Sequence, residues 1–173
     1  MLKINPKIIS LIDPDTRLRE LARDECLQAL KKDPDKCETW KDLGYALKEG
    51  EEVEFNGSSY TEQGCYLKTL EIDPTYFKGW FLLGGTVKEQ QTVKVGETNY
   101  SRKECYIKVL KINPKYGLAW TMLATLCLED DTIIIQDKSD TKDECKSYTK
   151  DECWKNAQKF APPQIKHINI SGI

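Results

Sequence analysis

The chain has 173 residues and a nearly even charge balance, with 26 Lys plus Arg, 28 Asp plus Glu and a net charge of −2. This balance argues against nucleic acid as a partner, because a nucleic-acid footprint needs a clustered excess of Lys and Arg. The sequence contains no run of about 18 apolar residues, so we expect no direct insertion into a membrane. The length suits one domain with a continuous core.

The first residues repeat a later part of the chain. The letters LKINPK at residues 2–7 recur at residues 110–115, so residues 1–14 are interpreted as the remnant of a preceding repeat. Two prolines and the lack of a small-residue cleavage site argue against a signal peptide. Asp13 and Pro14 then suit the N-cap and first position of a helix that runs to about Lys32.

A period of 40 residues governs the middle of the chain. Fixed periods of about 20–50 residues indicate an array whose units bury their apolar faces only against their neighbours. The recurring positions hold proline, tryptophan, leucine and a small residue: Pro34, Pro74 and Pro114; Trp40, Trp80 and Trp120; Leu43, Leu83 and Leu123; Gly44, Gly84 and Ala124.

Each unit is predicted to begin with a helix that follows the recurring proline. In the second unit, apolar residues between Phe77 and Val87 fall on one helical face. The recurring tryptophans are expected at equivalent buried sites between the two helices of a unit. Glycine costs about 1 kcal/mol inside a helix, so its recurrence at Gly44 and Gly84 indicates a close approach of two helices.

A short β-hairpin is predicted after this first helix. Residues 52–60 alternate apolar and charged side chains before Asn56-Gly57, a pair typical of tight hairpin turns because both positions need positive φ. Residues 92–100 repeat the pattern, and residues 132–137 begin a third copy. The alternative is a plain polar loop.

A second helix should complete each unit, and in the second unit it should span Arg102 to Ile112. Ser101 and Glu104 have the spacing of a capping box, as do Thr149 and Glu152.

The third unit departs from the pattern, because the letters TKDEC at residues 141–145 recur at residues 149–153. Either its second helix is long and begins near Thr141, or its hairpin is extended; we favour the long helix. Pro162 and Pro163 should end this helix, and residues 164–173 form a C-terminal tail.

No catalytic constellation is evident, so we expect the protein not to be an enzyme and to need no metal or cofactor. The only histidine, His167, lies in the tail. The seven cysteines lack the close pairs of a zinc site. They are interpreted as reduced, small apolar residues within helix contacts, which favours an intracellular, cytoplasmic protein.

Helix pairs with Trp-x-x-Leu-Gly in the first helix and Leu-x-x-Asp/Asn-Pro at the end of the second resemble tetratricopeptide repeats. The resemblance covers about residues 15–163, or three and a half repeats, although the 40-residue period departs from the usual shorter one. It implies a mainly α fold, a right-handed α-solenoid of helical hairpins, here with β-hairpins inserted between the helices. Sel1-like repeats are the second choice, because they lack the recurrent Asp/Asn-Pro junction.

The resemblance also implies a concave, partner-binding groove lined by the first helices. The groove-facing candidates carried over by register are Lys41, Tyr45, Lys78, Phe81, Leu82, Leu118, Met122 and Thr125. The Lys/Arg/Asn clamp by which some family members hold a C-terminal carboxylate is absent. The alternative is that Phe81, Leu82 and Met122 pack on the next first helix.

These patterns favour a protein–protein interaction module, an adaptor that binds a peptide or amphipathic helical segment of another protein in its groove. Two alternatives remain open. The chain could be a structural subunit of a larger protein or ribonucleoprotein assembly, held through its outer face and hairpin edge, or a self-associating repeat protein.

Overall fold

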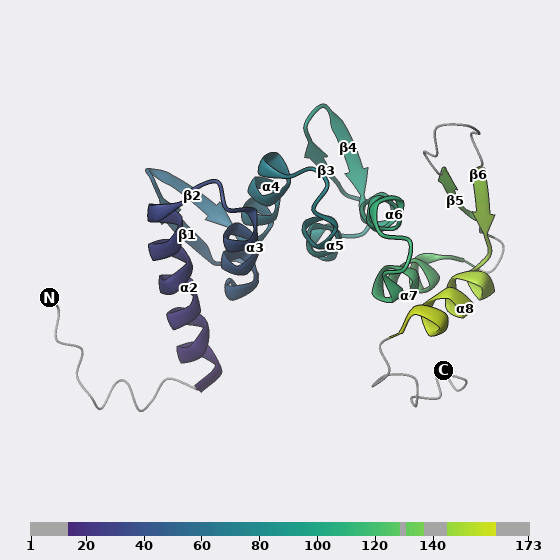
Figure 1. The fold of residues 1–173 in the computed structure, drawn as a ribbon, viewed down its shortest axis with the longest axis horizontal. Coiled ribbons are helices and arrows are strands. Elements are labelled where there is room, and N and C mark those ends of the chain that lie inside the picture. The colour runs from purple at the N-terminus through teal and green to yellow at the C-terminus, as the bar shows by residue number, and fades with distance from the viewer. Residues whose placement is uncertain (1–13, 129–130, 137–144, 162–173) are drawn as a thin grey trace, which may run out of the picture. The chain divides into compact units, whose positions relative to one another are not determined.

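The computed structural model describes residues 14–128, 131–136 and 145–161. Within these ranges the chain forms seven helices and six strands, so the expected mainly α fold with small antiparallel hairpins is confirmed (Figure 1). Residue contacts divide the chain into two compact units, Met1–Pro74 and Thr75–Ile173. The predicted N-terminal remnant and C-terminal tail lie almost entirely outside the described residues.

The first unit contains one complete helix pair and the helix that precedes it. Helix α2 packs on α3, and α3 packs on α4. A hairpin of β1 and β2 lies between α3 and α4 in the sequence. The elements are α2 (Pro14–Lys32), α3 (Cys37–Ala46), β1 (Glu52–Phe55), β2 (Ser58–Thr61) and α4 (Glu62–Ile72).

The second unit contains two further helix pairs, α5 with α6 and α7 with α8, and α7 also packs on α6. Each pair again has a hairpin between its helices in the sequence. The elements are α5 (Phe77–Thr86), β3 (Thr92–Val95), β4 (Thr98–Ser101), α6 (Arg102–Ile112), α7 (Gly117–Leu126), β5 (Ile133–Gln136), β6 (Cys145–Tyr148) and α8 (Lys150–Phe160).

Capping boxes mark the starts of α6 and α8 at the predicted residues. The Ser101 hydroxyl accepts a hydrogen bond from the Glu104 backbone N–H, and the Glu104 carboxylate accepts one from the Ser101 backbone N–H at 2.7 Å. Thr149 and Glu152 form the same capping box at the start of α8. Both boxes satisfy backbone donors that the first helical turn leaves without partners.

The two predicted hairpins are confirmed. Both have two-residue turns, with Val53 opposite Tyr60 in the first and Val93 opposite Tyr100 in the second. Positive φ values of 50° at Asn56 and 78° at Gly57 suit a type I′ turn, as the Asn-Gly pair indicated.

The preference for a long last helix beginning near Thr141 is wrong. Instead Ile133 pairs with Tyr148, and Thr149 caps a helix that begins at Lys150. This pair is 15 residues apart in sequence (148 − 133), whereas Val53 and Tyr60 are 7 apart (60 − 53), so the third hairpin has eight more residues between equivalent paired positions. The β-branched run at β5 favours a strand, and the capping box at Thr149 fixes the helix start.

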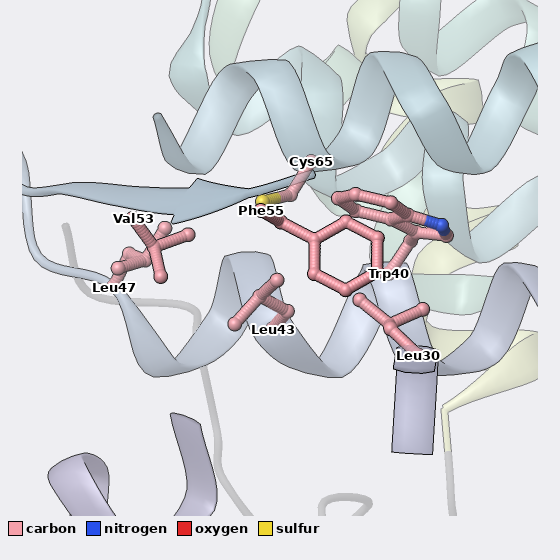
Figure 2. Close-up of a cluster of buried hydrophobic side chains, with 7 residues drawn as sticks. All are labelled: Leu30, Trp40, Leu43, Leu47, Val53, Phe55 and Cys65. Atoms are coloured by element: carbon pink, nitrogen blue, oxygen red, sulfur yellow. The ribbon is translucent and has the colours of Figure 1, made fainter. Parts of the chain in front are cut away.

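The recurring tryptophans occupy equivalent buried sites, as expected, with exposed fractions of 1%, 2% and 3% for Trp40, Trp80 and Trp120. In the first unit, Trp40 lies in a cluster with residues of both flanking helices and of β1, including Leu30, Phe55 and Cys65 (Figure 2). The hairpin contributes to this core because its inward side chains alternate with exposed ones.

Two contacts of the tryptophans were not anticipated from the sequence. Each indole packs against a tyrosine of the second hairpin strand, Tyr60, Tyr100 or Tyr148, with ring centroids 4.8 Å apart in all three cases. The Trp40 Nε1–H also donates to the Pro34 carbonyl at 2.7 Å, and Trp120 donates to Pro114 at 2.8 Å. These hydrogen bonds explain the constant spacing of proline and tryptophan in the first and third units.

The predicted close approach at the recurring glycines is confirmed. A Cβ atom at Gly44 would lie 2.6 Å from the Tyr66 ring, and one at Gly84 would lie 2.9 Å from the Tyr106 ring and 3.1 Å from the Cys105 Cβ. Each glycine of a first helix thus faces a Cys-Tyr pair of the second helix, Cys65-Tyr66 or Cys105-Tyr106.

Candidate interaction surface

The candidate residues lie on α3 in the first unit and on α5 and α7 in the second, at positions outside the tryptophan–leucine–glycine face. That face is buried in all three helices. The sequence-predicted site residues occupy the remaining positions and differ widely in exposure.

On α3, the predicted residues are Lys41 and Tyr45. The Lys41 ammonium forms an ion pair with Asp42, with Nζ and Oδ1 2.6 Å apart, and only 20% of the lysine side chain is exposed. Tyr45 is 72% exposed. An aromatic side chain presented so fully to solvent is available to a partner.

On α5, Lys78 is exposed, whereas Phe81 and Leu82 are half-buried. The Phe81 ring packs against Tyr106 of α6 at 5.5 Å and against Tyr116 at 5.2 Å between centroids. Tyr116 is the N-cap of α7. Phe81 therefore contributes to the packing of the second unit.

On α7, Leu118 is 42% exposed and Met122 is half-buried. Thr125 is exposed, and its hydroxyl donates to the Met122 carbonyl at 2.7 Å. Leu118 is thus the predicted apolar residue of the second unit that is most available to a partner.

Sequence reasoning missed two contributors to this surface. Phe77 packs against Tyr116 with centroids 5.0 Å apart, which places both rings in one aromatic cluster with Phe81. The signal was present in the sequence, since Tyr76 and Tyr116 occupy the same register 40 residues apart. Burial raises the pKa of the Tyr116 hydroxyl, so this ring stays neutral in the ordinary pH range.

The cysteines fit a structural role. The six cysteines whose side chains the structure describes are free thiols, and Cys65, Cys105, Cys127 and Cys153 are buried, as expected. Burial raises the pKa of Cys65 and of Cys105 to about 12, which keeps these thiols protonated and unreactive.

Two further findings concern only the part of the chain that the structure describes. It holds no group of three or more His, Cys, Asp or Glu side chains that could bind a metal ion. None of its helices combines the length and apolar character needed to cross a bilayer.

No protein-family model matches this chain, and no curated protein matches it significantly. The described residues themselves define its class: a mainly α protein of repeated helix pairs, each with a β-hairpin between its two helices.

Proposed function

We propose that the protein is a non-catalytic adaptor of tetratricopeptide-like design, whose helix pairs form a right-handed α-solenoid and whose first helices bind a segment of a partner protein. The equivalent tryptophan sites and the glycine–cysteine contacts support the repeat architecture. The six free thiols support an intracellular, cytoplasmic location.

One observation carries the binding proposal. Tyr45 and Leu118 are 72% and 42% exposed on first helices whose other large apolar residues are at least half-buried. Burying a large apolar side chain stabilises by about 1.5–3 kcal/mol, so each of these two exposed side chains, one in each unit, leaves that stabilisation unrealised within the chain. Such residues serve as anchors when a partner covers them.

The test places a photoreactive amino acid at Leu118 and, in a separate variant, at Ile112. Ile112 ends α6 and is 37% exposed, so the two positions match in exposure but lie on different kinds of helix. We expect the probe at Leu118 to cross-link a specific protein, whereas the probe at Ile112 should not cross-link that protein. With that partner purified, Leu118→Ser should weaken binding by about 1–2 kcal/mol, a five- to thirtyfold rise in Kd.

A second candidate, a structural subunit held through its hairpin edge, has its own support. Ile134 of β5 is 55% exposed on the outward face of the third hairpin. A photoreactive residue at Ile134 tests this candidate directly. Cross-linking from Ile134 but not from Leu118 would favour the structural subunit over the adaptor, and cross-linking of the chain to itself would favour self-association.

A further inference from the structure

The third repeat has exposed apolar side chains at positions where the other two repeats are charged. The equivalent positions are Leu118 with Glu38 and Lys78, Leu128 with Lys48 and Lys88, and Ile134 with Glu54 and Lys94. The three apolar side chains are 42%, 72% and 55% exposed, in that order. Single exposed apolar residues are ordinary on protein surfaces, so the structural setting of each decides whether it indicates an interaction.

Ile134 is the one of these three residues that lies on a strand. Its strand, β5, pairs with β6 in a two-stranded sheet, and the described residues hold no third strand beside β5. A strand at the edge of a sheet presents backbone N–H and C=O groups that pair readily with another strand. The occupant that fits this edge is therefore an extended segment and not a helix.

The outward side chains of β5 permit pairing between two copies, whereas those of the other first strands oppose it. Strand β1 exposes Glu52 and Glu54, and β3 exposes Lys94. Charged side chains on an edge strand prevent pairing between copies, because like charges would meet across the contact. Strand β5 reads Ile-Ile-Ile-Gln, so it has no charge and is rich in the β-branched residues that suit strands.

The segment that pairs best with this edge is extended, uncharged and rich in β-branched residues. Strand β5 of a second copy meets all three conditions. In an antiparallel pair related by a twofold axis, each strand contributes the same residues, and opposite side chains on one face lie about 4.5–5.5 Å apart. With Ile134 near the axis, the two isoleucine side chains cover one another, whereas two lysines or two glutamates there would repel.

We propose that the protein forms a twofold dimer in which the free edge of β5 pairs antiparallel with β5 of a second copy. The two third hairpins then make one four-stranded sheet. This inference goes beyond the adaptor proposal and does not depend on it. A dimer presents the first-helix surface twice, which raises the avidity for a partner that carries two binding segments. Because the contact is built on one short strand, we expect a small interface and a weak, concentration-dependent dimer.

Sedimentation velocity of the full chain over a wide range of concentrations tests the proposal. We expect the average mass to rise toward twice that of one chain as the concentration increases. Ile134→Lys gives the third hairpin the residue of the second, and it should raise the dissociation constant of the dimer about tenfold or more. Ile112→Lys, at an exposed apolar residue that ends α6, is the matched control and should leave this constant unchanged. Circular dichroism checks that both variants are folded.

A mixture of two variants tests the symmetric contact itself. Ile134→Glu should be as monomeric as Ile134→Lys, but equal amounts of the two should associate, because opposite charges then lie across the axis. Association is rescued in this way only if Ile134 faces Ile134 of the second copy.

Hydrogen exchange of the unaltered chain locates the contact without any substitution. Raising the protein concentration should slow amide exchange in β5 and leave it unchanged in β1 and β3, because only the β5 amides gain a strand partner.

Several results would overturn the inference. The chain could stay monomeric at every concentration, Ile134→Lys could dimerise as the unaltered chain does, or the mixed variants could fail to associate. Equal slowing of exchange in β1, β3 and β5 would place the contact elsewhere. Cross-linking from Ile134 to a different protein, and not to the chain itself, would assign the edge to a strand of a partner. A monomeric chain whose Leu118 probe still cross-links a partner would leave the adaptor proposal standing.

Discussion

At the scale of single residues, small side chains at one register determine how closely the paired helices pack. Gly44 and Gly84 have no room for a methyl group, since the ring of Tyr66 or Tyr106 occupies that place. The third pair has Ala124 at this register, with Trp154 in place of the tyrosine. Trp154 is half-buried, whereas Tyr66 and Tyr106 are buried.

Adjacent glycines in α5 provide a controlled test of this contact. A Cβ at Gly85 would have no neighbour within 4 Å, so Gly85→Ala should raise the free energy of unfolding by about 1 kcal/mol through helix propensity. Gly84→Ala gains the same stabilisation from helix propensity, but its methyl group overpacks against Tyr106 and Cys105, which costs about 1–3 kcal/mol. Urea denaturation measures the free energy of unfolding of both variants, and the difference between the two values gives the cost of overpacking. Equal stabilities would contradict the close approach of α5 and α6.

At the scale of elements, capping boxes couple two of the helix starts to pH. Hydrogen bonds from the Ser101 backbone and side chain lower the pKa of Glu104 below its ordinary value of 4.5. A carboxylate whose pKa is lower in the folded state stabilises the folded protein at pH values above its unfolded pKa. This contribution is lost as the pH falls through the folded pKa.

We therefore expect Glu104→Gln to reduce the stability of the protein at pH 7 by less than about 1 kcal/mol, since the site is largely solvated. The difference from the wild type should vanish at a pH below the folded pKa of Glu104. Thermal unfolding of the two proteins across this range measures it. The variant Lys111→Gln, at an exposed position in the last turn of the same helix, is the control. A Glu104→Gln difference that stays constant with pH would show that the charge of Glu104 contributes nothing.

At the scale of the whole molecule, stability should follow the division of the chain into two units. The buried Trp120 indole contacts Tyr148 and donates to Pro114, both within the second unit. Removing a ring of this size from a packed site costs about 3–5 kcal/mol. Arrays distribute stability among units and nearest-neighbour contacts.

Trp120→Ala should accordingly speed amide hydrogen exchange more strongly in residues 75–161 than in residues 14–74. Leu128→Ala is the control, because Leu128 is 72% exposed and surface substitutions change stability by about 0.5 kcal/mol or less. Uniformly faster exchange throughout both units would mean that they unfold as one cooperative body.

The sequence by itself determined most element boundaries of this protein. The start of α6, the turn at Asn56-Gly57 and the buried tryptophans follow from capping residues, positive φ and the 40-residue period. These signals are local or periodic, so they can be recognised without knowing which segments meet. The candidate partner-binding residues were placed by register alone, and the sequence could not separate the packed Phe81 from the exposed Leu118.

Only the tertiary structure decided the features that depend on contacts between distant segments. The pairing of β5 with β6 makes Cys145–Tyr148 a strand where a helix was predicted, and the contact of Tyr148 with Trp120 supports this pairing. A shallow groove between α2 and α3, lined by Leu18, Cys26 and Tyr45 among others, was likewise not predicted, because its lining residues meet only when the two helices pack.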